Sequence, residues 1–347
     1  MTTRAFRRTL PIALAGAVLL GSGPAGAAAA AAGPGSFPPP AWGPQFSLIT
    51  QPEAGHAQLY AMIASARSSI DLTMYELQDT TATADLAAAA ARGVRVRVIL
   101  DGYLTTANGP AYTYLNAHGV QAVWSSQVFW YTHQKTMTID DEYSVIMTEN
   151  WQSQYYSTSR DYDLIDRNPK DVAAIEQVFD ADLTYTPITP GDGADLVWSP
   201  TDAQPQILGL IDGAKFSIAI EAEEMDDADV TSALIAAAQR GVHIQIIMTN
   251  DDNEYATAFN ELVEAGAQVS TYAYTASLYI HAKTILVDFG TPWEKLFLGS
   301  ENFSNTSLTQ NRELGVIISN FPILWTVFKT DESDFFGGTP WTVTTTS

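Results

Sequence analysis

Two segments of this 347-residue chain carry the same three chemically capable side chains at the same spacing. The shared motif is His-x-Lys-x-x-x-x-Asp, and its copies contain His133, Lys135 and Asp140, and His281, Lys283 and Asp288. Histidine titrates near neutral pH, so it can serve as a nucleophile, an acid or a base. Lysine contributes positive charge beside a negatively charged group. A single copy would be weak evidence for a site, but two copies in register are a specific signal.

The spacing within each motif has a simple structural explanation. Residues 128–139 and 279–287 are rich in β-branched and aromatic side chains, so strands are predicted there. Because residues i and i+2 of a strand point to the same face, His133 and Lys135 should project together, as should their counterparts. Each strand leads through a turn into a predicted return strand, at residues 143–147 and 296–298.

Further polar side chains follow the return strands. In each copy a hydroxyl and an amide lie two positions apart, and these are Thr148 with Asn150 and Ser300 with Asn302. A little further along, each copy has an arginine followed by an acid, Arg160-Asp161 and Arg312-Glu313. All of these side chains are candidates for the same site as the histidines and lysines.

The motifs belong to a duplication of about half the chain. Four further pairs are separated by the same 148 positions as the histidines: Ser69 and Ser217, Glu76 and Glu224, Arg92 and Arg240, and Gly93 and Gly241. Helical patterns at 57–66, 83–92, 204–212 and 230–239 alternate with short apolar strands at 70–74, 94–100, 218–222 and 242–248. This alternation predicts α/β units with mixed sheets flanked by helices. We place the repeats at residues 46–188 and 194–338, joined by a turn-rich linker.

The N-terminal segment has the layout of an export signal. Three arginines precede an apolar run and then a stretch of small residues, so residues 1–32 are predicted to be a signal peptide and residues 33–45 a Gly/Pro-rich linker. An uncleaved membrane anchor is the alternative. The signal predicts a secreted, extracellular protein. The chain has no cysteine, which excludes disulfides and thiolate metal sites.

The charge balance disfavours a nucleic-acid partner. The net charge is −22, and a strongly negative surface repels a phosphate backbone. The acidic stretches at 221–229 and 251–254 have two interpretations, as cation sites or as solvated loops near the mouth of the site. The aromatic residues 129–131 before His133 likewise have two, as an interfacial rim or as ordinary strand packing.

Over residues 46–336 the sequence resembles the phospholipase D superfamily in its two-copy form. The resemblance rests on both His-Lys-Asp motifs, on the Gly-Ser-Glu-Asn stretch ending at Asn302, and on the spacing to Glu313. It implies two α/β repeats about a pseudo-twofold axis, with one shared active site and neither metal nor other cofactor. The first copy has Met147 where the family usually has glycine, which raises the question of whether this side chain crowds the site.

The resemblance also implies a role for each candidate residue. His133 is expected to attack phosphorus and His281 to act as the general acid, although the order is open to reversal. The two lysines, with Asn150, Asn302, Thr148 and Ser300, are expected to bind phosphate. Asp161 and Glu313 are expected to orient the histidine rings. Asp140 and Asp288 complete the catalytic motifs and are interpreted as strand-end residues that steady the site.

The predicted function is therefore a phospholipase D type of phosphodiesterase. It would cleave the bond between phosphate and the headgroup alcohol of a glycerophospholipid through a phosphohistidine, with headgroup exchange when an alcohol replaces water. We expect a monomer that acts peripherally at a membrane surface. The alternatives are a secreted nuclease of the same superfamily, a non-catalytic phosphate binder, and a synthase joining two lipids, which usually has membrane spans.

Overall fold

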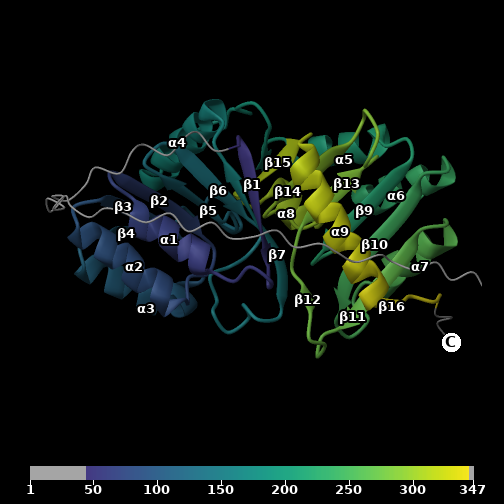
Figure 1. Ribbon diagram of the computed structural model, residues 1–347, viewed down its shortest axis with the longest axis horizontal. Helices are drawn as coiled ribbons and strands as arrows, with labels where there is room; N and C mark the ends of the chain where they lie inside the picture. Colours follow the sequence, from purple (N-terminus) through teal and green to yellow (C-terminus); the bar gives the residue numbers. More distant parts are fainter. Residues whose placement is uncertain (1–43, 344–347) are drawn as a thin grey trace, which may run out of the picture. The chain divides into compact units, whose positions relative to one another are not determined.

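Each half of the chain builds a mixed sheet with helices packed on it, as the sequence predicts (Figure 1). The computed structural model describes residues 44–343. The predicted signal peptide (1–32) and nearly all of the predicted linker (33–45) lie outside these residues. Residues from Pro44 onward belong to one compact unit.

The first half contains eleven elements in the described residues. They are β1 (Phe46–Gln51), α1 (Ala57–Ser65), β2 (Ser69–Met74), α2 (Thr80–Ala91), β3 (Arg95–Leu100), α3 (Thr105–Ala117), β4 (Gln121–Trp124), β5 (Thr136–Ile139), β6 (Tyr143–Met147), β7 (Ser159–Asp166) and α4 (Pro169–Leu183). The second half continues with β8 (Leu196–Ser199), α5 (Ala203–Gly213), β9 (Ser217–Ala222), α6 (Ala228–Gln239), β10 (His243–Asn250), α7 (Ala256–Glu264), β11 (Gln268–Ala273), β12 (Tyr279–Ile280), β13 (Thr284–Val287), β14 (Lys295–Gly299), α8 (Asn305–Thr309), β15 (Glu313–Ile318), α9 (Phe321–Gly337) and β16 (Thr339–Pro340).

The two sheets have the same topology. The first runs β1-β7-β6-β5-β2-β3-β4, and the second runs β8-β15-β14-β13-β9-β10-β11 with β16 added at the edge. In each, three parallel strands joined through helices are continued by antiparallel strands. Ser69 pairs with Arg95 in the first sheet and Ser217 with His243 in the second, which is the same register 148 positions on. The sequence duplication is therefore a duplication of a whole folding unit.

Local sequence explains the matched helices. Asp79 and Asp227 accept hydrogen bonds from the first-turn amides of α2 and α6, and this satisfies donors that a helix start leaves free. Each helix ends at an arginine followed by Gly93 or Gly241, whose φ angles of 94° and 89° favour glycine. Arg92 then donates to the carbonyls that end α1. Both helices therefore end in a glycine cap with a left-handed backbone conformation.

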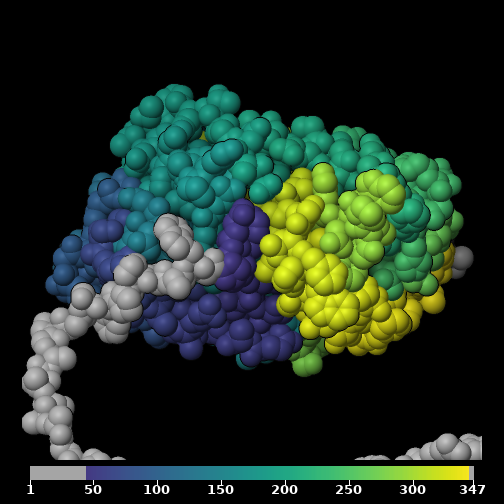
Figure 2. Space-filling view, turned by 45° about the horizontal axis from the view of Figure 1, so that its top comes forward, coloured from purple at the N-terminus to yellow at the C-terminus, as the bar shows by residue number. Residues whose placement is uncertain are grey.

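Three clusters of buried side chains hold the layers together. Helices α1 to α3 cover one face of the first sheet, and α5 to α7 cover one face of the second. Alternation along β2 sends Ile70, Leu72 and Met74 to this outer layer and Asp71 to the opposite face. The third cluster combines strands of both sheets with α4 and α9. Figure 2 shows the first described strand lying against the C-terminal helix, in agreement with the contacts between β1 and α9.

The two strands predicted to carry the His-x-Lys segments, at 128–139 and 279–287, are shorter than expected. Strand β5 begins only at Thr136, and β12 and β13 are separated by residues 281–283. Both His-x-Lys segments therefore lie just before a strand rather than inside it. The reason is that the backbone there turns to the other half of the chain: the His133 amide donates to the Arg312 carbonyl, and the His281 amide donates to the Arg160 carbonyl.

Candidate active site

The two His-x-Lys segments meet at a single cavity of about 600 Å³. His133 and His281 both line it, although they are far apart in sequence. Side chains from both halves complete the lining, and they include Asn150, Asp161, Glu223 and Asn302. Of the predicted residues, the cavity therefore brings together both histidines, both asparagines and Asp161, whereas Lys135, Lys283 and Glu313 do not line it.

Each histidine is paired with an acid from the opposite half. His133 Nδ1 lies 2.7 Å from Glu313 Oε2, and His281 Nδ1 lies 2.8 Å from Asp161 Oδ1. An Nδ1–H donated to a carboxylate leaves Nε2 as the nitrogen with a free lone pair. Neither histidine has its orienting acid within its own repeat.

The acids are themselves held by hydroxyl and amide donors. Asp161 accepts from the hydroxyls of Thr148, at 2.6 Å, and Ser159, at 2.5 Å. Glu313 accepts from the Ser307 hydroxyl at 2.5 Å and from the Asn311 amide at 2.9 Å. Burial would raise the pKa of each acid, but its charged and hydrogen-bonded neighbours, the paired histidine foremost, lower both pKa values. Both acids are therefore carboxylates at neutral pH.

This arrangement corrects the phosphate-binding role predicted for Thr148 and Ser300. Both side chains are fully buried. The Thr148 hydroxyl is used by Asp161, and the Ser300 hydroxyl accepts from the Leu314 amide. The Thr148 hydroxyl has a single proton, which it donates to Asp161, and the Ser300 hydroxyl is held by the strand, so these residues support the acid and the strand rather than phosphate.

The arginines before the two acids also cross between the halves. Arg160 donates to Asp334 on α9, with Nε 2.6 Å from the carboxylate, and Arg312 pairs with Asp182 on α4 at 2.9 Å. Each arginine thus links the strand that carries one orienting acid to the last helix of the other repeat. In each matched sequence pair, Arg160-Asp161 and Arg312-Glu313, the arginine therefore contacts a helix of the other repeat and the acid contacts a histidine of the other repeat.

The two lysines lie below the histidines and are almost fully buried. Lys135 Nζ donates to the His133 carbonyl at 2.6 Å, and Lys283 Nζ donates to the His281 carbonyl at 2.5 Å. Burial, reinforced by the charge of Lys283, lowers the pKa of Lys135 to about 7. Burial also lowers the pKa of His133 against the opposing effect of Glu313. The first half therefore holds a neutral imidazole beside an easily deprotonated lysine.

Comparison with known proteins identifies the family to which the two repeats belong. The family model for the PLD-like domain of cardiolipin synthase matches residues 59–183 and again residues 207–329. The chain belongs to the phospholipase D superfamily. It is therefore a phosphodiesterase-type member of that superfamily, related to proteins that modify phospholipids.

Individual members of the phospholipase D superfamily show how far the similarity extends. Cardiolipin synthase B of Shigella flexneri is 25% identical over 327 residues, which cover 80% of this chain and 76% of that protein. Phospholipase D of Rickettsia felis is 31% identical over 122 residues, covering 35% of this chain and 58% of that protein.

Solved structures share the fold. Phosphatidylserine synthase of Haemophilus influenzae superposes with a TM-score of 0.65 over 86% of this chain and 87% of that one, at 13% identity. Polyphosphate kinase of Porphyromonas gingivalis gives the same TM-score over 83% of this chain, but only 50% of its own length, at 17% identity.

The aspartates of the superfamily motif do not line the cavity. Asp140 accepts from the backbone amides of Arg67, Ser68 and Ser69, and Asp288 accepts in the same way from residues 215–217. Both have φ angles in the left-handed region, 57° and 50°. They fasten the turn before β6 or β14 to the start of β2 or β9, which agrees with their interpretation as strand-end residues, although the motif groups them with the catalytic residues.

The departure from the superfamily pattern at Met147 leaves the cavity open. The side chain is fully buried in the core cluster of the first half and does not line the cavity. In the second half, a Cβ on Gly299 would clash with the backbone of Gly315, so glycine is required there. In the first half, Glu149 turns instead to His56, whose Nε2 lies 2.8 Å away.

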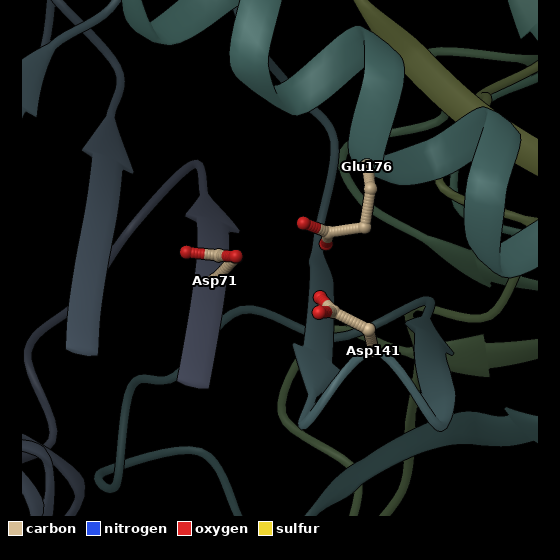
Figure 3. A group of neighbouring side chains, drawn as sticks. All are labelled: Asp71, Asp141 and Glu176. Atoms are coloured by element: carbon tan, nitrogen blue, oxygen red, sulfur yellow. The ribbon is translucent and has the colours of Figure 1, made fainter. Parts of the chain in front are cut away.

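One acidic group in the described residues could suggest a metal, and its surroundings argue against it. Asp71, Asp141 and Glu176 point toward one another (Figure 3). Arg97 already forms two hydrogen bonds with Asp71, at 2.6 and 2.7 Å. Burial and the charge of Asp71 raise the pKa of Glu176 to about 8, so it is protonated at neutral pH. An arginine thus supplies the positive charge here.

Sequence reasoning included Glu223 only as part of the acidic stretch 221–229 near the mouth of the site and gave it no role of its own. Glu223 lines the cavity, and its Oε2 lies 2.7 Å from Lys283 Nζ. The corresponding position in the first half is Tyr75, 148 residues earlier, and its ring meets the ring of His133 edge-on at 4.5 Å. The repeat offset could have exposed this difference, because Tyr75 and Glu223 directly precede the matched pair Glu76 and Glu224.

Proposed function

We propose that this protein is a phospholipase D that cleaves the phosphate–headgroup bond of a glycerophospholipid and passes the phosphatidyl group to water or a second alcohol. The crossed histidine–acid pairs at one cavity carry the proposal. They provide two imidazoles in which the orienting acids use Nδ1 and leave Nε2 for the reaction. A buried lysine donates to the carbonyl of each histidine.

In the first step, His133 Nε2 attacks phosphorus and the bond from phosphorus to the headgroup oxygen breaks. The lowered pKa of His133 keeps this nitrogen unprotonated at neutral pH. His281 gives its Nε2 proton to the departing headgroup oxygen. Asp161 stabilises the protonated ring before transfer, and Glu313 keeps the His133 proton on Nδ1.

In the second step, the neutral His281 takes a proton from water or an alcohol, whose oxygen attacks phosphorus. The phosphorus–nitrogen bond breaks, and its electron pair returns to His133 Nε2. Water yields phosphatidic acid, and an alcohol yields a new phosphatidyl ester. The lysines and the amides of Asn150 and Asn302 would balance the charge of the phosphoryl oxygens in both steps.

The rest of the cavity lining supports a lipid with a cationic headgroup over a nucleic acid. Five acidic residues line it, Glu76, Glu149, Asp161, Glu223 and Glu224, together with five tyrosines, Tyr75, Tyr155, Tyr156, Tyr274 and Tyr279. Of the acids, Asp161 and Glu223 are anions at neutral pH, because their cationic neighbours lower their pKa values. Acidic and aromatic groups attract an ammonium group through charge and cation–π contacts. They repel the many phosphates of a nucleic acid.

Exposed apolar side chains near the cavity support action at a membrane surface. Val128 and Trp130, in the turn before His133, are 76% and 60% exposed, and Tyr155 and Tyr274 at the cavity are 50% and 59% exposed. The predicted aromatic rim thus lies in loops rather than in a packed strand. Between residues 44 and 343, no helix has the length and apolarity to cross a bilayer.

The test is release of choline from phosphatidylcholine vesicles by the wild type and by His133→Ala, in EDTA, with a parallel DNA digestion. We expect metal-independent release that His133→Ala abolishes, and acid-stable lipid products that change from phosphatidic acid to phosphatidylethanol when ethanol is added. DNA cleavage without choline release would replace this proposal with the nuclease alternative. Release that survives in His133→Ala would contradict the mechanism.

Similarity to cardiolipin synthase B over 80% of the chain favours a second candidate, transfer to a lipid alcohol. Vesicles of phosphatidylglycerol distinguish the two. A synthase would form cardiolipin and free glycerol from two phosphatidylglycerol molecules, whereas a hydrolase would form phosphatidic acid and glycerol.

A further inference from the structure

An internal carboxylate occupies the position between the second histidine–lysine pair and the cavity. Glu223 follows β9, and its Oε2 lies 2.7 Å from Lys283 Nζ, 3.2 Å from Asn302 Nδ2 and 3.5 Å from His281 Nε2. One oxygen therefore contacts the lysine, the amide and the reactive histidine nitrogen. These three groups are the donors that a phosphoryl oxygen would use in this half of the site.

The first half has no such group among its described residues. Tyr75 stands at the corresponding position, and the Lys135 ammonium lies over its ring at 5.1 Å from the centroid. An aromatic face attracts the lysine without taking up its hydrogen-bonding capacity as an anion does. The donors of the first half thus remain available for a ligand, while those of the second half already bind an oxygen anion.

We propose that Glu223 is an internal ligand that occupies the phosphoryl-oxygen position of the second half until a substrate displaces it. The inference rests on the proposed function only in assuming that a phosphoryl group binds between the two histidine–lysine pairs. A phosphoryl oxygen and the Glu223 oxygen cannot contact Lys283 Nζ, Asn302 Nδ2 and His281 Nε2 at the same time, because they would need the same space.

The electrostatics make this competition strong. Burial would raise the pKa of Glu223, but the charges of His281 and Lys283 and the hydrogen bond from Lys283 lower it. Glu223 is therefore an anion at neutral pH, and an incoming phosphate meets a negative charge on its own binding site. A small free anion gains too little from the remaining contacts to displace it, whereas a whole lipid adds apolar and headgroup contacts.

The side chain has room to move away. Glu223 lines the cavity and 22% of its side chain is exposed, so a rotation into the cavity can release Lys283 without a backbone shift. Displacement would leave the carboxylate in the cavity near the departing headgroup.

Titration with inorganic phosphate by calorimetry tests the inference on the protein without a substrate. Glu223→Gln removes the anion, and Glu223→Asp keeps the charge but shortens the side chain by one methylene, so that it no longer reaches Lys283. Both variants are expected to bind phosphate about tenfold more tightly than the wild type. A tenfold change in Kd corresponds to the free energy of about one charge-assisted hydrogen bond. Glu224→Gln is the matched control, because Glu224 lines the same cavity and carries the same type of carboxyl without contacting Lys283.

The outcomes separate occupation of the site from a general charge effect. Tighter binding in both Glu223 variants, with a change below threefold in Glu224→Gln, supports the inference. Equal effects of Glu223→Gln and Glu224→Gln, or no gain in Glu223→Asp, would overturn it. Phosphate binding does not require turnover, so a gain in the Glu223 variants stands even if no lipid is cleaved, and the proposed function would then fail alone.

Discussion

At the scale of single residues, the two halves have become chemically different. His133 faces the ring of Tyr75, and its pKa is lowered by burial, whereas His281 is bracketed by the carboxylates of Asp161 and Glu223. A buried ring against an aromatic edge is favoured as neutral, whereas carboxylates on both sides of a ring can accept hydrogen bonds from its two N–H groups. This asymmetry supports His133 as nucleophile and His281 as acid, the order first suggested by resemblance.

The pH dependence of turnover should reflect this asymmetry. Because burial lowers the pKa of His133 below the ordinary histidine value of 6.5, the acid limb of kcat/KM should fall below pH 6.5. Lys135, with a pKa of about 7, is charged below that pH and loses its charge above it, so activity should decline as the pH rises through 7. A soluble short-chain phosphatidylcholine gives the profile. In Lys135→Arg, whose guanidinium stays charged, the remaining activity should lose the limb near pH 7, and an unmoved limb would argue against Lys135 as its source.

The orienting acids should have separable effects. Glu313→Gln removes the carboxylate from His133 and should slow formation of the phosphohistidine by about 10³-fold or more, because the ring can adopt the wrong tautomer. Asp161→Asn acts on His281 and should slow departure of a poor leaving group such as choline far more than departure of p-nitrophenol, which needs no proton. Rapid-quench measurement of the covalent intermediate with both leaving groups distinguishes them. Identical leaving-group dependence in the two variants would contradict the assigned roles.

At the scale of elements, the strands carrying Asp161 and Glu313 are fastened by helices from the opposite repeat. Arg160 binds Asp334 on α9, and Arg312 binds Asp182 on α4. Because each arginine directly precedes an orienting acid, Asp161 or Glu313, the same ion pair joins the repeats and sets the position of that acid. Predicted strands and helices near 57–100 and 204–248 agree with the structure because their periodicity and caps are local. The strand predicted at 128–139 is wrong over its first part, because that backbone pairs with the other half.

Loss of one of these ion pairs between the repeats should destabilise the whole described unit. Arg312 is almost fully buried, with 3% of its side chain exposed, and Arg312→Met leaves Asp182 without its partner. The expected loss is about 3 kcal/mol in the free energy of unfolding, measured by urea denaturation. Arg67→Met is the control, because the Arg67 side chain, which pairs with Glu142 and at 3.5 Å with Asp140, is 56% exposed, and an exposed arginine of this kind contributes at most about 1 kcal/mol per pair. Equal losses in the two variants would mean that the crossed arginine is an ordinary surface pair.

At the scale of the whole molecule, one chain supplies both histidines to one cavity and provides each with its own orienting acid and buried lysine. This completeness is compatible with the predicted monomer, which stays a prediction, as do secretion and the removal of residues 1–32. Action at a lipid surface also stays a proposal, and it rests on the exposed apolar side chains in the turn before His133.

Removal of the most exposed aromatic side chain of that turn should weaken membrane binding selectively. Trp130→Ala is expected to reduce binding to phosphatidylcholine vesicles by about tenfold in a sedimentation assay, because burial of the indole in the interface is lost. Turnover of a soluble short-chain lipid should change less than twofold. Phe321→Ala, an aromatic residue at the start of α9 that is 55% exposed, is the comparison, and an equal loss of vesicle binding there would remove the special role of the turn.

The amino-acid sequence by itself determined the duplication, the α/β units and the identity of both histidine–lysine pairs, because a constant offset and local periodicity are visible in one dimension. Only the tertiary structure decided which acid serves which histidine. His281 and Asp161 are 120 positions apart, and His133 and Glu313 are 180 apart. Such pairs arise from packing two repeats about a pseudo-twofold axis, and that packing leaves no local pattern. The same packing assigned Thr148 to Asp161 rather than to phosphate, and it placed Glu223 on the lysine that a substrate would need.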